Sequence, residues 1–312
     1  MGRKVDDIMW SSFGGFLFVC IAGALWIGVG VSVSKCSEKK LNYNVVQGLA
    51  YLGSALFCAI LLAGKSLAHG TSGISWFGFV MCMLAGIANF FNYVLTGKAM
   101  QKGPNGLVWG IMQAGMIGSF LMGVTFFGEK PDVLRLTGLL LIIGGVLGMG
   151  LNKGGKNASS PPDKSWVLLS LGAMVLVMVT HCCSSLPSFF PDLGKNDTVS
   201  RTLGMYLGGV TGFVLTTLPG MIRKRDYGRK GEWINAGILM VLNTSASLFF
   251  FYRGLDLLVK IGRAGLAYPL AIGVCVIGFS LYSLFVLKEK FARIALAGLG
   301  AVCAGIIMIA IR

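Results

Sequence analysis

The sequence contains ten apolar runs that are each long enough to cross a bilayer as a helix. A hydrocarbon core of about 30 Å requires roughly 20 apolar residues in a helix. The runs occupy residues 13–33, 45–64, 74–95, 107–127, 134–151, 166–186, 198–218, 233–252, 265–287 and 292–311. They are continuously apolar, whereas the strands of a membrane barrel alternate polar and apolar residues. The chain is therefore predicted to be an all-α polytopic membrane protein with ten transmembrane helices.

Composition agrees with a protein whose surroundings are lipid. Charged residues make up 12% of the chain, about half the share of a soluble domain. The net charge is +15, but the basic residues form short clusters between apolar runs, as at Lys39-Lys40 and Arg223-Lys224-Arg225. Such clusters are typical of contacts with anionic head groups, so lipids and not nucleic acid are the expected partners. The eight cysteines show no CxxC spacing, and we interpret them as buried thiols that hold no metal.

The two halves of the chain are related in sequence. When the chain is shifted by 159 or 160 residues, an aromatic motif and several glycines recur in the same order: 90–93 (FFNY) on 249–252 (FFFY), Gly103 on Gly262, Gly138 on Gly298, and Gly145 on Gly305. We predict a first repeat at 1–152, a polar, turn-rich linker at 153–165, and a second repeat at 166–312. Because each repeat holds five runs, the second would enter the membrane from the opposite side, as in the inverted repeats of secondary transporters.

The duplicated chain resembles the ten-helix, EamA-like branch of the drug/metabolite transporter superfamily. An acidic–basic pair begins at Glu129, between the fourth and fifth runs, and again at Glu289, between the ninth and tenth. The similar segments run from 103–107 (GPNGL) to 128–131 (GEKP) and from 262–266 (GRAGL) to 288–290 (KEK). The resemblance implies a secondary transporter that works by alternating access, in a superfamily whose members carry sugars, amino acids, nucleotide sugars, phosphorylated metabolites and drugs. Many members have a proline early in the fourth span, where this chain has Gly110, although Pro269 is present in the second half.

Amide and aromatic side chains inside the apolar runs are the candidate substrate-binding residues. Polar groups are costly in a membrane interior, so each is a candidate for function. Helical spacing places Asn89 and Asn92 on one face of a helix, and Trp109 and Gln113 on one face of the next. The full set is Asn89, Asn92, Trp109, Gln113, Asn243, Tyr252 and Tyr268. A cavity lined in this way would suit a neutral polyol or a zwitterion, whereas the alternative is a set of hydrogen bonds that only hold the bundle together.

Charged and titratable residues are candidates for coupling, gating or anion binding. His181 would titrate near neutral pH and couple transport to protons, or would lie at the interface bonded to a backbone carbonyl. Glu129 and Glu289 lie at turns, where they would gate the cavity through ion pairs or anchor the protein to head groups. An anionic substrate would be bound by basic residues near the ends of runs, namely Lys98, Arg253, Lys260 and Arg263. The alternative for these four is snorkelling to the interface.

The sequence argues against covalent chemistry. The acidic residues fall at the ends of runs or in loops, and the motifs GxSxG, HExxH and the phosphate-binding loop are absent. We therefore expect no enzyme activity and no cofactor. Three functions stay open: a carrier of a small polar metabolite such as a sugar or an amino acid, with a proton or a cation as the coupling ion; an exchanger of anionic or phosphorylated metabolites; and a non-transporting sensor or scaffold.

Basic residues also predict an orientation. Sixteen of the 27 Lys and Arg residues lie in or beside the connections that follow odd-numbered runs. The positive-inside rule then places the connection around 223–230 in the cytoplasm and both termini outside. We expect a multi-pass protein of the cell (inner) membrane and a monomer, with a dimer as the alternative.

Overall fold

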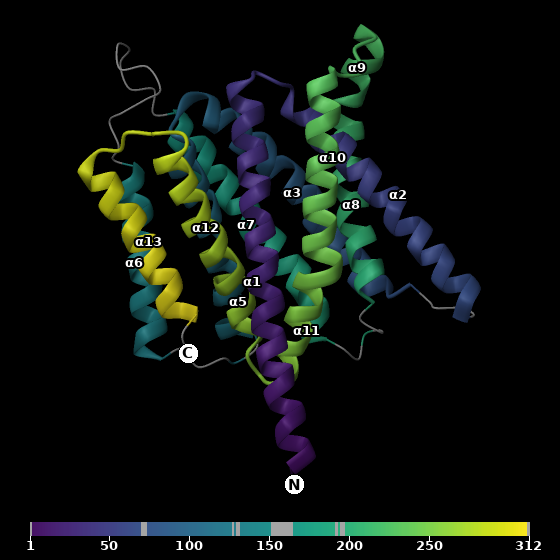
Figure 1. Cartoon of the computed structure of the whole chain (residues 1–312), viewed down its shortest axis with the longest axis vertical. Coiled ribbons are helices and arrows are strands. Elements are labelled where there is room, and N and C mark those ends of the chain that lie inside the picture. Colours follow the sequence, from purple (N-terminus) through teal and green to yellow (C-terminus); the bar gives the residue numbers. More distant parts are fainter. Residues whose placement is uncertain are drawn as a thin grey trace.

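The computed structural model describes residues 2–69, 74–126, 128, 132–150, 165–190, 193 and 197–310. These residues form helices and connections without a strand (Figure 1). The first half contains α1 (Gly2–Glu38), α2 (Tyr43–His69), α3 (Trp76–Lys102), α4 (Asn105–Gln113), η1 (Ala114–Met116), α5 (Ile117–Phe126) and α6 (Val133–Gly150). The second half contains α7 (Ser165–Phe189), α8 (Thr198–Thr216), α9 (Leu218–Lys224), α10 (Lys230–Ser245), η3 (Ala246–Phe251), α11 (Tyr252–Lys260), η4 (Ala264–Leu266), α12 (Ala267–Phe285) and α13 (Arg293–Ala310). Most of the predicted linker lies outside the described residues.

Among the described residues, seven helical segments are long and apolar enough to cross a membrane. They are Phe13–Glu38, Tyr43–Ala68, Trp76–Lys102, Asn105–Phe126, Ser165–Phe189, Lys230–Lys260 and Ala264–Phe285. The pair α8 and α9, bent by 46°, counts as an eighth if it is one span, and Val133–Met149 and Arg293–Met308 are shorter apolar helices. The prediction of an all-α, multi-pass membrane protein is thus confirmed, while the number of ten crossings stays a prediction.

Two of the predicted spans are interrupted inside the bundle. The run 107–127 divides into α4, the 3₁₀ turn η1 and α5. The run 233–252 continues to Lys260 and contains the π-helix η3. A π-helix bonds residue i to i+5, which rotates the residues after it relative to an α-helix, and such turns are frequent at functional sites. Both interruptions adjoin residues of the pocket described below.

The packing of the helices is dominated by contacts between the two halves. α6 lies against α13, and α3 lies against both α7 and α8 (Figure 1). α1 packs against α10, α11 and α12, whereas α2 packs against α8 and α10, and α4 packs against α7. The largest buried cluster therefore draws residues from nearly every helix, and among the described residues neither half has a separate core.

Glycines allow α6 and α13 to touch backbone to backbone. A Cβ placed on Gly145 would lie 2.5 Å from the carbonyl oxygen of Gly298, and one on Gly298 would lie 2.6 Å from that of Gly145. A Cβ on Gly305 would likewise collide with the carbonyl oxygen of Gly138. Small residues at such crossings are the usual means of close helix packing in membranes.

The substitution Gly145→Val should destabilise the protein, because a side chain at this position forces α6 and α13 apart. Overpacking of this kind costs about 1–3 kcal/mol of unfolding free energy. The measurement is the melting temperature of the purified protein in detergent. Gly144→Val is the matched control, since a Cβ on Gly144 meets no atom within 4 Å. Equal losses from the two variants would contradict the close packing of these helices.

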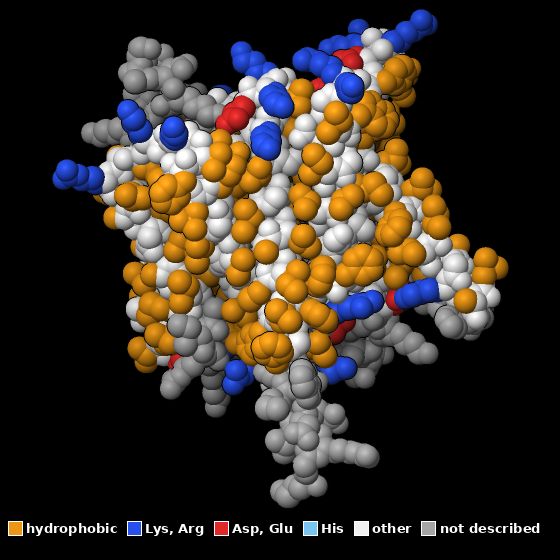
Figure 2. Space-filling view, in the orientation of Figure 1, with side chains coloured by type: hydrophobic (Ala, Val, Ile, Leu, Met, Phe, Trp, Pro, Cys, Tyr) orange, Lys and Arg blue, Asp and Glu red, His pale blue; other side chains and the backbone are white. Residues whose placement is uncertain are grey.

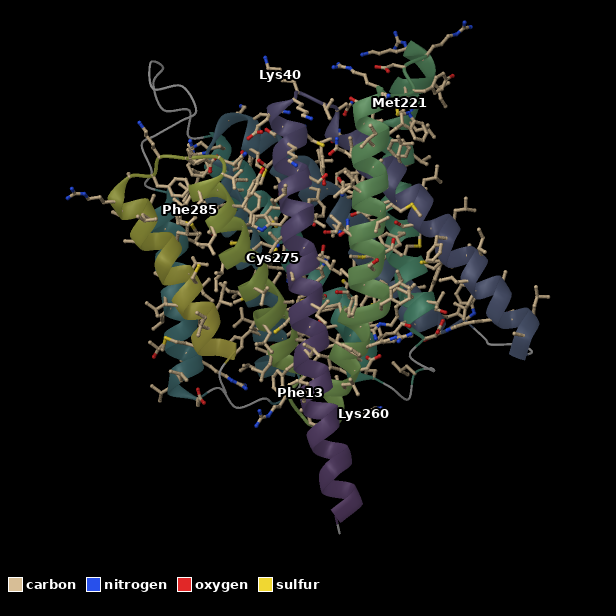
Figure 3. The ribbon with its side chains drawn as sticks, in the orientation of Figure 1. Phe13, Lys40, Met221, Lys260, Cys275 and Phe285 are labelled. Carbon is tan, nitrogen blue, oxygen red and sulfur yellow. The ribbon has the colours of Figure 1, made fainter. Side chains whose placement is uncertain are left out.

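Exposed basic side chains gather at one end of the molecule (Figure 2). α1 begins and α13 ends at one end, which we call the terminal end (Figure 1). Lys260 lies near this end, and Lys40 lies at the opposite one (Figure 3). The opposite end, which we call the basic end, carries a group of exposed basic side chains (Figure 2): Lys39, Lys40, Arg223, Lys224, Arg225, Arg229 and Lys230. Apolar side chains cover much of the surface between the two ends in this view (Figure 2).

Candidate functional site

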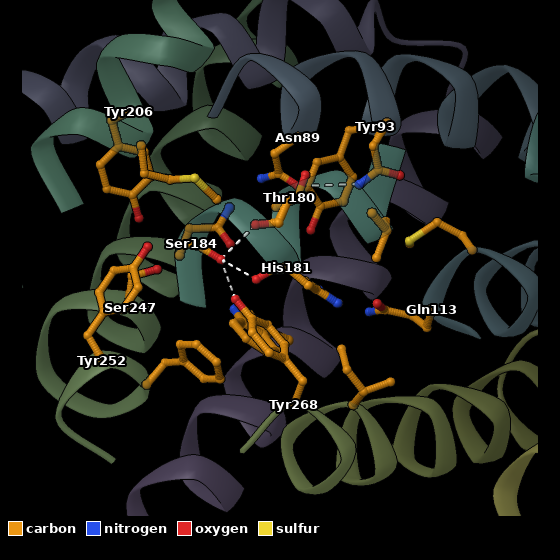
Figure 4. Close-up of a pocket in the computed structure, with 18 of the residues that line it drawn as sticks. Asn89, Tyr93, Gln113, Thr180, His181, Ser184, Tyr206, Ser247, Tyr252 and Tyr268 are labelled. Carbon is orange, nitrogen blue, oxygen red and sulfur yellow. Dashed lines mark hydrogen bonds between the residues drawn. The ribbon is translucent and has the colours of Figure 1, made fainter. Parts of the chain in front are cut away.

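A polar pocket lies between helices of both halves. Its cavity volume is about 70 Å³, which is room for a few water molecules and is smaller than the usual range of about 300–1,000 Å³ for sites that hold drug-sized ligands. α1, α2, α3 and α4 contribute side chains from the first half, and α7, α8, α10, η3, α11 and α12 contribute from the second. Amide, hydroxyl and aromatic groups therefore converge on one space inside an apolar bundle (Figure 4).

Six of the seven predicted substrate-binding residues line this pocket: Asn89, Asn92, Gln113, Asn243, Tyr252 and Tyr268. Trp109, the seventh, does not. Its side chain is 1% exposed, and its ring lies 5.2 Å from that of Phe279 and 6.4 Å from that of Tyr93 between ring centroids. Gln113 is one turn further along α4, so the same helix face passes from the aromatic core at Trp109 to the pocket at Gln113.

Two of the pocket amides are held in place by a network on α2 and α3. Asn89 Nδ2 donates a hydrogen bond of 2.8 Å to the Tyr51 hydroxyl, and Gln47 Nε2 donates one of 3.0 Å to the same oxygen. Asn92 Nδ2 donates to Asn89 Oδ1 at 3.3 Å, and Thr96 Oγ1 donates to the Asn92 backbone oxygen at 2.9 Å. This network fixes the positions of Asn89 and Asn92. Asn89 thus makes a bond between helices, the alternative role predicted for these amides, whereas the bonds of Asn92 stay within α3.

Asn243 and Gln113 are bound less firmly by the protein. Gln113 Nε2 lies 3.6 Å from Cys275 Sγ, a weak acceptor. Within the described part of the chain, the Asn243 side chain makes no hydrogen bond, although it lines the pocket. These two amides keep donors and acceptors available for a solute.

His181 forms part of the pocket wall. It is 7% exposed, and its ring stacks on that of Tyr268 with 3.9 Å between centroids and 25° between planes. Ser184, one turn along α7 from Thr180, is hydrogen-bonded to the Tyr268 hydroxyl (Figure 4). His181 Nδ1 is buried without a partner among the described residues. The imidazole therefore keeps polar capacity that a solute or water would satisfy, and the alternative of a histidine at the membrane interface stays a prediction.

Sequence reasoning missed several aromatic and hydroxyl side chains of the pocket. They include Trp26, Tyr51, Thr180, Ser184 and Tyr206. Phe251, which η3 carries into the wall, lies 5.2 Å from Trp26 and 4.6 Å from Tyr268 between ring centroids. Tyrosine in membrane helices favours the interfaces, where its hydroxyl meets water. The position of Tyr51 and Tyr206 well inside apolar runs was therefore an available clue.

Arg201 was also missed, because it lies near the predicted start of a span and resembles a flanking charge. The structure buries it completely on α8. Its guanidinium donates to Asp256 Oδ1 at 2.9 Å and to the Ser184 backbone oxygen at 3.2 Å. It also lies over the Tyr252 ring, 4.2 Å from the centroid. Arg201 thus stands directly behind two residues of the pocket wall, Ser184 and Tyr252.

The remaining predicted charged residues lie away from the pocket or outside the described residues. Arg253 is exposed on α11, and Glu129 falls outside the described residues. Glu289 accepts hydrogen bonds from the backbone N–H groups of Asn105 at 2.7 Å and Gly106 at 3.0 Å. Its carboxylate therefore caps the start of α4 and, among the described residues, makes no ion pair. Within the same part of the chain, no three His, Cys, Asp or Glu side chains gather as a metal site would require.

Comparison with known proteins defines the fold alone. No family model matches the chain, and no curated protein matches it. A solved structure, described as "Crystal structure of protein", aligns with 94% of this chain and 95% of that chain, with a TM-score of 0.57 and 15% sequence identity. At this identity the likeness concerns the path of the backbone over nearly the whole of both chains. The chain therefore shares its overall fold with that structure.

Proposed function

We propose that this protein is a secondary transporter that carries a small, uncharged or zwitterionic polar metabolite across a membrane by alternating access. The observation that carries the proposal is the pocket of amides, hydroxyls and aromatic rings enclosed between two halves of an apolar bundle. Such a pocket is costly in a membrane unless polar solutes or water occupy it. The fold and the site suit a member of the EamA-like branch of the drug/metabolite transporter superfamily, as the sequence suggests.

Helix packing supports ten crossings arranged as two inverted repeats. If α1 to α6 hold spans one to five and α7 to α13 hold spans six to ten, the most extensive contacts between the halves recur when the halves are exchanged. The exchange replaces α3 by α10 and α11, α7 by α1, and α8 by α2. The contact of α3 with α7 then corresponds to that of α10 and α11 with α1, and the contact of α3 with α8 corresponds to that of α10 with α2. The contact of α1 with α12 recurs as α7 with α4, while α2 with α8 and α6 with α13 map onto themselves. These exchanges are those of a pseudo-two-fold axis.

The glycine contacts follow the same exchange. The repeat pairs Gly138 with Gly298 and Gly145 with Gly305. Exchanging the halves therefore turns the contact of Gly145 with Gly298 into that of Gly305 with Gly138, and both are present. An inverted repeat with its site between the halves is a common architecture of secondary transporters.

The charge of the pocket favours a neutral or zwitterionic solute over an anion. No Lys, Arg, Asp or Glu lines the described pocket. The basic residues that an anionic substrate was expected to use are all exposed, namely Lys98, Arg253, Lys260 and Arg263. An unpaired anion in this pocket would have amide and hydroxyl donors but no cation facing it, which is unfavourable inside a low-dielectric bundle. His181 is the one imidazole in the wall, so coupling to protons through it stays part of the proposal.

Orientation follows from the basic end. The positive-inside rule places this end in the cytoplasm and the terminal end outside the cell. We propose the cell membrane as the location and a monomer as the working unit. Protease added from each side of sealed vesicles tests the orientation, since the exposed Tyr227 connection should be cut from the cytoplasmic side only.

Two measurements on the purified protein test the function. A thermal-shift screen of polyols, amino acids and phosphorylated metabolites should find a neutral or zwitterionic ligand that raises the melting temperature, because a ligand of the folded state stabilises it. That ligand should then drive counterflow in liposomes that contain the protein. Binding without counterflow would indicate a sensor or scaffold. Binding and counterflow of phosphorylated compounds alone would reverse the assignment of the substrate class.

A further inference from the structure

A single guanidinium joins three helices beneath the pocket. Arg201 on α8 bonds Asp256 on α11 at 2.9 Å, and it bonds Ser188 Oγ on α7, also at 2.9 Å. The Arg201 side chain is fully buried, whereas that of Asp256 is 27% exposed. Removing either partner alone would leave a charge without its counter-ion inside the bundle, so the three helices are held together as long as the pair is intact.

The Arg201–Asp256 pair lies between the pocket and the terminal end. Along α11, Tyr252 lines the pocket, Asp256 follows one turn later, and exposed Lys260 ends the helix near the terminal end (Figure 3). Along α7, Ser184 lines the pocket and Ser188 follows one turn later. One turn of helix is about 5.4 Å. The ion pair therefore sits one turn beyond the pocket wall, on the side that faces the terminal end.

We propose that Arg201 and Asp256 form the gate that closes the pocket toward the terminal end, and that the pair separates when the carrier opens there. The proposal rests on the proposed carrier function and adds to it the residues that control access on one side. Opening would let water replace the partners of both ions, which lowers the cost of separating them. Tyr252, packed beneath the guanidinium, would lose this contact in the same step and so link the gate to the pocket wall.

Cys82 provides a reporter at the level of the gate. Its side chain is fully buried, and its Sγ lies 3.7 Å from the Tyr252 hydroxyl. A protein with Cys82 as its single cysteine, the other seven replaced by alanine, is reconstituted in sealed vesicles. A membrane-impermeant methanethiosulfonate is then added from one side at a time. In the parent protein we expect slow modification from the terminal side.

Breaking the pair should expose Cys82 from the terminal side only. Asp256→Ala should raise the modification rate by about tenfold or more, as expected when a minor open state becomes the main one. The double variant R201Q/D256N should do the same, and it leaves no unpaired charge that could prevent folding. Melting temperatures identify the folded variants. If Cys82 stays as protected in the folded double variant as in the parent, the pair is not the gate.

Lys65→Ala is the matched control. It removes an ion pair of 2.9 Å with Asp197 that joins α2 to α8 but has side chains 45% and 24% exposed. Burial alone would raise the pKa of Asp197, but hydrogen bonds from Lys65 and Ser200 outweigh burial and lower it, so this carboxylate is ionised at neutral pH. Lys65→Ala should leave Cys82 protected, since exposed pairs contribute little. If Cys82 were modified equally fast in Lys65→Ala and Asp256→Ala, its exposure would come from a general loosening of the bundle, and the proposal would be overturned.

Modification reports access, whereas counterflow reports transport, so the two proposals fail separately. If the gate variants expose Cys82 but the protein performs no counterflow of any solute that it binds, the gate proposal stands and the carrier proposal is rejected. A protected Cys82 in a protein that performs counterflow would retain the carrier and reject the gate.

Discussion

Asn243→Leu is expected to abolish most transport while leaving the amount of protein in the membrane unchanged. The Asn243 side chain lines the pocket and makes no hydrogen bond to any described residue. Its amide is therefore available to the solute, and leucine of similar size offers neither donor nor acceptor. Losing such a bond leaves a polar group of the bound solute unsatisfied, which costs about 1–3 kcal/mol, or roughly 5- to 150-fold in binding. Counterflow in liposomes, at equal protein content, measures the loss.

Asn235→Leu is the matched control for this prediction. Asn235 lies on the same helix, α10, eight residues before Asn243, and it does not line the pocket. Its Nδ2 donates to the backbone oxygen of Gly231 at 2.7 Å, so its polar capacity is already used. We expect counterflow within about twofold of the parent, as for a substitution outside the binding site. Similar losses in Asn235→Leu and Asn243→Leu would show that the bundle needs its amides for packing and not for a solute.

Gln113→Leu and Asn92→Leu extend the comparison across the pocket. Gln113 has only a weak bond to Cys275 Sγ, so its replacement should act on transport and little on stability. Asn92 takes part in the network with Asn89 and Thr96, so its replacement should lower both transport and the melting temperature. If both variants transport normally, the pocket is not the site of solute binding.

The parts of this site that sequence could predict are those in which a polar side chain interrupts an apolar run. Asn92, Gln113 and Asn243 stand out for that reason, because amides in a bilayer require an explanation wherever the chain folds. Tyr51 and Tyr206 were harder to find, since tyrosine is common in membrane helices and only its depth distinguishes it. Sequence therefore identifies the site residues whose polar groups are most costly to bury in a membrane, and it misses those, such as tyrosine, whose burial costs less.

Helix geometry accounts for the other differences. Trp109 and Gln113 were placed on one helix face, as the structure has them, but residues one turn apart on the same face can contact different neighbours. The π-helix η3 is a second feature that the sequence did not predict. It sets the direction of Phe251, and no local sequence motif indicates it. Arg201 is a third. Its position near the start of a run predicts a lipid-facing charge, and only the packing of α7 and α11 around α8 reveals a buried one.

His181→Leu is the second substitution expected to have a large effect. His181 stacks on Tyr268 and makes no side-chain hydrogen bond within the described residues, yet it lies in the pocket wall. Leucine would keep much of the packing and remove the imidazole nitrogens, so we expect counterflow to fall by about 10- to 100-fold. His181→Gln, whose amide has a donor and an acceptor but no titration near neutral pH, should restore most of that loss.

The pair of variants also separates binding from coupling. Counterflow needs no proton gradient, whereas uptake driven by an imposed pH difference does. If His181 carries the coupling proton, His181→Gln should retain counterflow and lose the response of uptake to pH between about 5.5 and 8, the range in which an imidazole titrates. If His181 only binds the solute, the pH response of His181→Gln should match that of the parent. Unchanged counterflow in His181→Leu would remove His181 from solute binding, and an unchanged response of its uptake to pH would remove it from coupling as well, because a side chain that binds the solute or carries the coupling proton must affect one of these two measurements.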